Sequence, residues 1–236
     1  LFPYTTLFRS LTGQYGHTNG VRTLADTLDG RMDHLLQKQL QAGGYQTAMI
    51  GKWHLGHGEH TDRSGFDYWC VLPGQGEYHD PAMYEMGEEK TFPGYVSEVI
   101  TDQSLAWLEQ RDRDRPFFLM CHHKAPHRPW EPGERYAELY AGQTIPEPDT
   151  LFDDYATRAE AIRACRVHME DLLPDYDLKA ALPEGLSPEE ERRWRYQRYI
   201  KDYLRCCASV DDSVGRLLDY LDTEGIAENT LVVYTS

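Results

Sequence analysis

The sequence has no long hydrophobic run and little positive charge. No uninterrupted apolar run is longer than that of residues 117–121, whereas a membrane-spanning helix needs roughly 18 apolar residues. There are 24 Lys and Arg against 39 Asp and Glu, which gives a net charge of −15. Nucleic-acid binders neutralise phosphates with Lys and Arg, so we expect neither a nucleic-acid nor a membrane partner. An anionic ligand would require a local cationic pocket.

Cysteine is sparse and irregularly spaced. The five cysteines form no C-x-x-C pair and no zinc-ribbon spacing, and an odd number is a poor disulfide framework. Cys206 and Cys207 are adjacent on a predicted helix, where neighbouring side chains do not face each other. We therefore interpret these two cysteines as packing residues.

The composition is that of a globular α/β protein. Apolar residues make up 40% of the chain and aromatic residues 12%, which is enough for a buried core and too much for a disordered chain. The length of 236 residues fits one large domain, or one domain with part of another, because a domain holds about 150 residues.

Helices and short apolar strands alternate in the first half of the chain. Apolar residues at positions 32, 35, 36 and 40 have helical spacing, and the glycines at 43–44 end this helix because glycine adopts a left-handed cap without strain. A buried strand is predicted at 45–50. A second helix is predicted from residue 96 to a break at 115–116, and strand 117–121 follows it.

The second half begins with irregular chain and continues as a long helix. Residues 55–94 and the proline-rich segment 126–148 are predicted to be loops, the former with short strands. Ser187 is a good N-cap, followed by proline and glutamates, and Gly225 ends the apolar stripe. A third strand is predicted at 231–234. This alternation predicts an α/β fold with a mostly parallel sheet.

Cationic residues follow two of the predicted strands. Lys52 and His54 follow the strand 45–50, and His127 follows the strand 117–121. Ligands bind at the carboxyl ends of parallel strands, so these three side chains are expected to face one small anion. A lysine supplies a point charge, and a histidine donates a hydrogen bond or a proton. Without further context, such residues are more often solvated loop residues.

Three other clusters are weaker candidates, each for a metal site. His54, His57, Glu59 and His60 are chemically suitable zinc ligands, but their spacing matches no recurrent site. The spacing of His122, His123 and His127 also matches no recurrent metal site. The pair at 211–212 lies on a predicted helix, so we interpret it as a solvated acidic face. We therefore predict no metal ligand in this chain.

Several motifs together resemble the formylglycine-dependent sulfatases. L-T-G-Q-Y and H-T-N-G-V at 11–21 are similar to the segment that follows the family's nucleophile signature, C-x-P-S-R-A. G-K-W-H-L-G at 51–56 and A-P-H-R-P-W at 125–130 resemble two further motifs, and 231–236 resembles the strand before an aspartate metal motif. Their order and spacing also match, over residues 11–236. The nearest relatives resemble bacterial enzymes of the N-acetylglucosamine-6-sulfatase kind.

The resemblance implies a fold, a reaction and roles for individual residues. It implies an alkaline-phosphatase-like, mostly parallel mixed sheet flanked by helices, with a sulfated carbohydrate as substrate. Calcium and a formylglycine made from cysteine would serve the parent enzyme, which family habit makes periplasmic or secreted. Lys52 would bind a sulfate oxygen, His54 would hydrogen-bond the formylglycine diol, and His127 would face the leaving-group oxygen. His123 and Lys124 would contact substrate.

The chain departs from the family pattern at both ends. The signature cysteine falls at Pro3 and the signature arginine at Leu7. We interpret residues 1–10, which resemble translated sequencing-adapter sequence, as a non-native leader, and residues 11–236 as part of a sulfatase catalytic domain. The metal-binding aspartates and a second sulfate-binding lysine are expected outside this chain.

Three functional interpretations remain open at this point. The parent is a sulfatase of which this chain alone is inactive, a phosphoesterase of the alkaline phosphatase superfamily, or a non-catalytic glycan-binding remnant. K-W-H-L-G favours the sulfatase. A missing central strand would expose sheet edges, so we also predict poor solubility.

Overall fold

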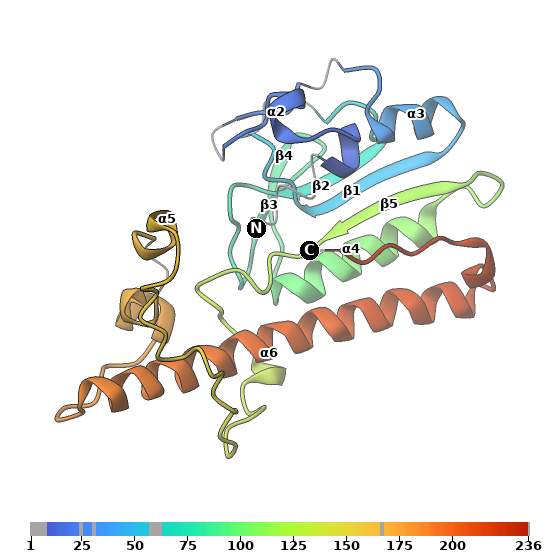
Figure 1. Cartoon of the computed structure of the whole chain (residues 1–236). Coiled ribbons are helices and arrows are strands. Elements are labelled where there is room, and N and C mark those ends of the chain that lie inside the picture. The colour runs from blue at the N-terminus through green and yellow to red at the C-terminus, as the bar shows by residue number, and fades with distance from the viewer. Residues whose placement is uncertain (1–8, 24–25, 30–31, 57–62, 166–167, 236) are drawn as a thin grey trace. The chain divides into compact units, whose positions relative to one another are not determined.

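The chain forms two compact units. The computed structural model describes residues 9–23, 26–29, 32–56, 63–165 and 168–235. The first unit comprises Leu1–Lys124 and Asp211–Ser236, and the second comprises Ala125–Val210. The helices and strands of the whole chain, labelled as in Figure 1, are α2 (Gly16–Asn19), α3 (Leu36–Ala42), β1 (Gln46–Lys52), β2 (Tyr68–Leu72), β3 (Ala82–Glu85), β4 (Glu88–Thr91), α4 (Val96–Gln110), β5 (Phe117–His122), η1 (Glu134–Tyr136), α5 (Glu160–Arg163), η2 (Met169–Asp171), η3 (Pro174–Leu178), α6 (Pro188–Thr223) and η4 (Ala227–Asn229).

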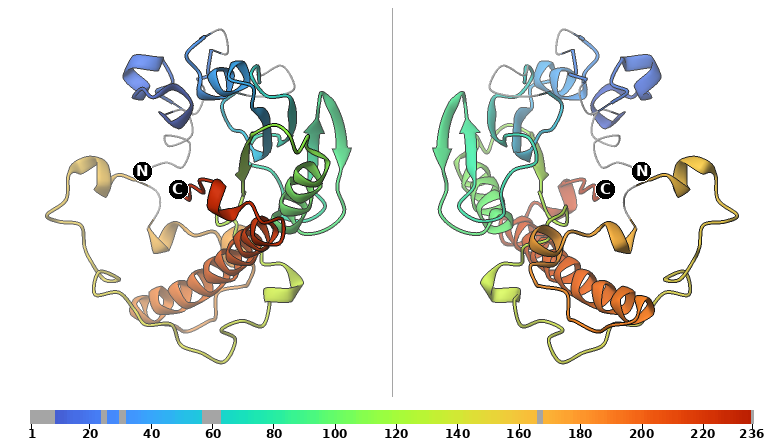
Figure 2. Two further views of the ribbon diagram at one scale, coloured as in Figure 1. Left: turned by 90° about the vertical axis from the view of Figure 1, so that its right-hand side faces the viewer. Right: turned by 90° about the vertical axis from the view of Figure 1, so that its left-hand side faces the viewer.

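A five-stranded mixed sheet organises the first unit. The strand order is β4-β3-β2-β1-β5. β1 is parallel to both β2 and β5, whereas β2–β3 and β3–β4 are antiparallel. The hairpin of β3 and β4 forms one edge of the sheet (Figure 2), and β5 forms the other. The predicted mixed sheet flanked by helices is confirmed, with equal numbers of parallel and antiparallel pairings.

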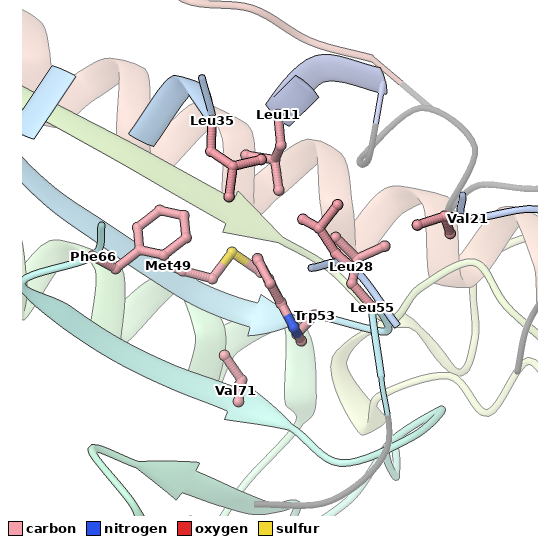
Figure 3. Close-up of a cluster of buried hydrophobic side chains, with 9 residues drawn as sticks. All are labelled: Leu11, Val21, Leu28, Leu35, Met49, Trp53, Leu55, Phe66 and Val71. Atoms are coloured by element: carbon pink, nitrogen blue, oxygen red, sulfur yellow. The ribbon is translucent and has the colours of Figure 1, made fainter. Parts of the chain in front are cut away.

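Apolar side chains on one face of the sheet form a buried cluster (Figure 3). Met49 of β1 and Val71 of β2 point to the same face, because Gly51 pairs with Val71 and Met49 with Trp69 in the parallel register. Residues from the N-terminal segment and the start of α3 cover them. The cluster consists of Leu11, Val21, Leu28, Leu35, Met49, Trp53, Leu55, Phe66 and Val71.

Helix α4 packs on β1 and β5 and is joined to the last part of α6. Its apolar residues Val96 and Ile100 are fully buried. Ser213 donates a hydrogen bond of 3.3 Å to the carbonyl of Ser97, and Arg216 pairs with Asp102 at 2.6 Å. These contacts hold residues 211–223 of α6 against the sheet's helical layer in the first unit.

The second unit is an irregular chain attached to one side of a helix. Gln197 of α6 exchanges hydrogen bonds of 3.0 and 2.7 Å with the backbone of Ile145, and Tyr196 donates one of 2.7 Å to the carbonyl of Pro146. Arg205 donates one of 2.8 Å to the carbonyl of Leu139. Backbone carbonyls of the excursion are thus satisfied by side chains of α6 rather than by a sheet.

Most predicted elements are confirmed, and the strand at 231–234 is wrong. The helix that ends at 43–44 begins at Leu36, and Gly44 has the left-handed φ of 91° expected of a glycine stop. Residues 231–234 form no strand, and Leu231 is 89% exposed. A strand needs a neighbour to satisfy its backbone groups, and in the part of the chain that the structure describes none pairs with this segment.

Among the residues that the structure describes, no helix combines the length and the apolar character that crossing a membrane requires.

Candidate functional site

The carboxyl ends of β1 and β5 and the turn after β2 carry the candidate residues. β1 ends at Lys52, and its parallel pairing with β2 and β5 puts the three strand ends at one edge of the sheet. After β2 the chain makes a tight turn, closed by a 2.9 Å hydrogen bond from Gly76 N–H to the carbonyl of Pro73. The glycines on either side of Gln75 have left-handed φ values of 52° and 68°, which L-residues rarely adopt. This turn presents Gln75 to the strand ends.

Gln75 connects three of the predicted site residues. Lys52 Nζ donates to its side-chain oxygen at 2.5 Å, and its side-chain nitrogen lies 3.4 Å from His54 Nε2. Lys124 Nζ donates to the Gln75 carbonyl at 3.2 Å. The structure therefore brings together Lys52, His54 and Lys124 around one neutral residue. We call this cluster of side chains, Lys52, His54, Gln75 and Lys124, the Gln75 pocket.

Lys124 is held in the Gln75 pocket by an aromatic ring. Its Nζ lies 4.5 Å from the ring centroid of Tyr78, and Lys124 is only 4% exposed. Tyr78 is itself buried and stacks on Tyr95, with ring centroids 6.0 Å apart. A cation over an aromatic face is attracted by the ring quadrupole. The ring therefore stabilises the ammonium without neutralising it.

The two ammonium groups make the pocket electropositive. Burial, and then the charge of Lys124, lower the pKa of Lys52 from 10.5 to about 8. Within the described ranges, Lys52 forms no ion pair with a carboxylate, and its hydrogen-bond acceptor is a neutral amide. A bound anion would relieve both the desolvation and the repulsion. The pocket therefore supplies the local positive charge that an anionic ligand needs in this acidic chain.

Gly51 allows β5 to approach β1 closely below the pocket. Its φ is 102°, and a Cβ added there would lie 2.0 Å from the carbonyl oxygen of His122. His122 Nδ1 lies 3.3 Å from the carbonyl of Lys52. Burial lowers the pKa of His122 to about 4, so its ring is neutral at pH 7. The strand end that carries Lys52 is thus fixed by β5.

His123 lies beside Cys121 rather than in the Gln75 pocket. Its Nε2 is 3.9 Å from Cys121 Sγ, and its buried Nδ1 has no hydrogen-bond partner among the described residues. Burial, and then the neighbouring His122, lower the pKa of His123 to about 4. Burial raises the pKa of the Cys121 thiol to about 11. Both groups are therefore neutral at pH 7, and the predicted contact of His123 with substrate stays a prediction.

His127 belongs to the second unit, in a segment fixed by an ion pair. Its Nδ1 lies 2.7 Å from the carbonyl of Arg128. Arg128 pairs with the fully buried Asp177 through a 2.8 Å bond from Nε and a second, very short bond. Lys179 donates to the carbonyls of residues 129 and 130 at 2.7 and 3.2 Å. The prediction that His127 faces the same anion as Lys52 stays a prediction.

The metal predictions concern residues that the structure describes only in part. His57, Glu59 and His60 lie outside the described residues. Across the ranges that are described, no three His, Cys, Asp or Glu residues cluster as metal ligands. The described residues therefore do not fit a calcium site. Pro3, where the signature cysteine would fall, also lies outside the described residues.

Gln75 was not among the site residues predicted from the sequence. Residues 55–94 were predicted to be loops with short strands, and a lone glutamine carries no chemical signal. The available signal was P-G-x-G directly after an apolar run, which is typical of a tight turn at a strand end. Asp177 and Lys179 were missed because they lie about 50 residues from the motif that they hold.

Comparisons with known proteins agree on one family. A family model described as Sulfatase matches residues 4–236. The N-acetylglucosamine-6-O-sulfatase of Bacteroides thetaiotaomicron is 37% identical over 269 aligned residues, which cover 96% of this chain and 47% of that protein. A solved structure described as a complex with its substrate D-glucosamine-2-N,6-O-disulfate matches with a TM-score of 0.90 and 35% identity, over 97% of this chain and 54% of that chain.

A more distant similarity concerns the fold alone. The phosphonate monoester hydrolase of Agrobacterium radiobacter matches with a TM-score of 0.63 and 17% identity, over 98% of this chain and 52% of that chain. The chain thus spans about half the length of the relatives that it matches.

Proposed function

Because the chain belongs to the sulfatase family, we propose that it is part of the catalytic domain of an enzyme that hydrolyses sulfate esters of a glycan. The resemblance noted in the sequence is confirmed at the level of the family and of the alkaline-phosphatase-like fold. The observation that carries the proposal is the Gln75 pocket, where Lys52 and His54 contact the side-chain amide of Gln75 and Lys124 contacts its backbone carbonyl.

The charge and geometry of the pocket suit a sulfate ester. Lys52 would bind a sulfate oxygen as a point charge, and Lys124 would add a second positive charge on the same side. His54 would hydrogen-bond the attacking group. His127 would face the leaving-group oxygen and donate a proton to it as a general acid, a role that histidine can fill near neutral pH. His123 would contact substrate at the border of the site.

The proposed substrate is a sulfated carbohydrate of the N-acetylglucosamine-6-sulfate type. Matches in two comparisons support it: a relative named N-acetylglucosamine-6-O-sulfatase, and a solved structure described as a complex with its substrate D-glucosamine-2-N,6-O-disulfate. We propose calcium, formylglycine and a periplasmic or secreted location for the whole protein from the family pattern alone. The described residues do not fit the metal, and position 3 is a proline.

For this 236-residue chain we propose binding without turnover. If the motif that begins at Leu11 is held in register, the family's nucleophile position falls at Pro3, and proline has no side-chain nucleophile. With a chromogenic sulfate ester and added calcium, the purified chain should release sulfate only at the background rate. Turnover that the substitution Lys52→Ala abolishes would contradict this part of the proposal.

Binding of glucosamine 6-sulfate, followed by calorimetry, tests the proposed function. Glucosamine 6-sulfate should bind more tightly than glucosamine, and Lys52→Ala should weaken binding about tenfold or more, because it removes a charge close to the sulfate. Lys90→Ala is the matched control, since it removes a lysine from the edge strand β4, away from the carboxyl end of β1. Equal affinity for the two sugars would overturn the proposal. Tighter binding of glucosamine 6-phosphate would favour the phosphoesterase.

A further inference from the structure

The orientation of the Gln75 side chain is fixed by Lys52. An ammonium group can only donate hydrogen bonds, so the amide oxygen of Gln75 must face Lys52 Nζ, 2.5 Å away. The amide nitrogen then faces His54 Nε2 at 3.4 Å. An amide nitrogen can only donate, so His54 Nε2 must offer its lone pair. The neutral His54 ring therefore carries its proton on Nδ1.

We propose that Gln75 is a positioning residue of this pocket, which anchors Lys52 and holds His54 as the tautomer protonated on Nδ1. The identity of the ligand rests on the proposed function. The tautomer of His54 is inferred only from the contacts of Gln75 with Lys52 and His54. The turn supports the assignment, because left-handed glycines flank Gln75 and its own carbonyl accepts a hydrogen bond from Lys124. Both ends of the residue are thereby tied to the pocket.

A neutral amide suits this position better than a carboxylate would. A glutamate at position 75 would form an ion pair with Lys52 and cancel charge that the pocket offers to an anion. Its oxygen would also accept a hydrogen bond from His54 Nε2 and so draw the histidine proton to that nitrogen. Glutamine contacts the same two side chains but adds no negative charge to offset the two lysines. It also favours the His54 tautomer protonated on Nδ1 rather than on Nε2.

The tautomer is measurable in the ligand-free full chain by ¹⁵N NMR of labelled histidines. The ring nitrogens of a neutral histidine have different chemical shifts when protonated and unprotonated, and the signals that His54→Gln removes identify His54. In the native chain, we expect the protonated shift on Nδ1 and the unprotonated shift on Nε2. In Gln75→Glu, we expect the protonated shift on Nε2.

A neighbouring substitution provides the matched control. Glu77 lies two residues away, with its side chain exposed, so Glu77→Gln should leave the His54 spectrum unchanged. Protonation of Nε2 in the native chain would overturn the inference, whether or not any variant folds. An unchanged tautomer in a folded Gln75→Glu variant would overturn it as well.

Binding measurements separate this inference from the proposed function. Gln75→Glu should weaken glucosamine 6-sulfate binding about tenfold, because a negative charge enters the pocket. If the native chain shows the expected tautomer but does not distinguish glucosamine 6-sulfate from glucosamine, the proposed function fails and the role of Gln75 stands. If the sulfated sugar binds and the tautomer is the other one, the role of Gln75 fails and the function stands.

Discussion

Lys52 combines a positive charge with a proton that it can lose near neutral pH. Its pKa is lowered from 10.5 to about 8, first by burial and then by the ammonium of Lys124. An anion bound beside it favours the charged form and raises the pKa again. The chain should therefore bind protons when it binds a sulfate ester near pH 8, and its affinity should fall as the pH rises through 8.

Proton uptake is measurable by titration calorimetry in buffers of different ionisation enthalpy. At pH 8, the observed binding enthalpy of glucosamine 6-sulfate should change with the buffer. Lys52→Arg is the matched control, because an arginine keeps its charge throughout this range and should abolish the buffer dependence. A binding enthalpy that is independent of the buffer in the native chain would contradict the lowered pKa.

Gly51 should tolerate no side chain. In Gly51→Ala, the Cβ would meet the His122 carbonyl oxygen at 2.0 Å in a backbone conformation with a φ of 102°. We expect the free energy of unfolding in urea to fall by about 3 kcal/mol, from strain and overpacking together. Gly87→Ala is the control: its φ is 100°, but no atom lies within 4 Å of the added Cβ. Equal losses in the two variants would show that the close approach of the strands is unimportant.

The sequence predicts the charged residues of the pocket but not the residue that connects them. Lys52 and His54 could be found because they directly follow a predicted buried strand, where ligands of parallel sheets bind, and Lys124 through the resemblance to the sulfatase motifs. Gln75 could not, because its importance comes from a turn that brings it to a strand end 23 residues away in the chain. The role of His127 rests on its motif, and the structure adds the contacts that fix its neighbours.

At the scale of elements, the second unit depends on the ion pair between Arg128 and Asp177. Asp177 is fully buried, and it also accepts a 2.8 Å hydrogen bond from the N–H of Leu173. Asp177→Asn should lower the free energy of unfolding by about 2 kcal/mol, because it leaves a partly buried guanidinium without its counter-charge. Urea denaturation measures the loss. Asp175→Asn, an exposed position on the same short helix η3, should change stability little, and an equal loss there would contradict the role of the pair.

Helices were predicted from the sequence better than strands. The long α6 and α4 show apolar residues at helical spacing, and each ends near the predicted glycine or proline. β4 was not predicted as a separate strand because all of its residues are exposed and three of its four are charged. The segment 231–234 fails for the opposite reason: its residues favour strand, but strand formation also depends on a neighbour that sequence pattern does not reveal.

At the scale of the whole molecule, exposed apolar surface should limit solubility. Residues 231–234 are 52–89% exposed, and β5 is an apolar edge strand of the described sheet. The double variant Leu231→Lys, Val233→Lys should self-associate less than the native chain in sedimentation velocity. Gln143→Lys with Asn229→Lys is the control, because it adds the same charge at exposed polar sites. A native chain that stays monomeric and melts cooperatively would contradict this prediction.

The two outer strands of the sheet differ in a way that bears on how copies can assemble. β4 presents Glu88, Glu89 and Lys90 to solvent, and charges of this kind discourage another backbone from pairing there. β5 carries mainly apolar side chains. Because only one edge strand can pair with another backbone, a sheet can join a second copy only once, through β5 against β5. Both outer edges of the resulting pair are then β4 strands, whose charges discourage further pairing. Edge pairing of this chain should therefore stop at a closed two-fold assembly, whereas a sheet receptive on both sides would propagate into a fibre.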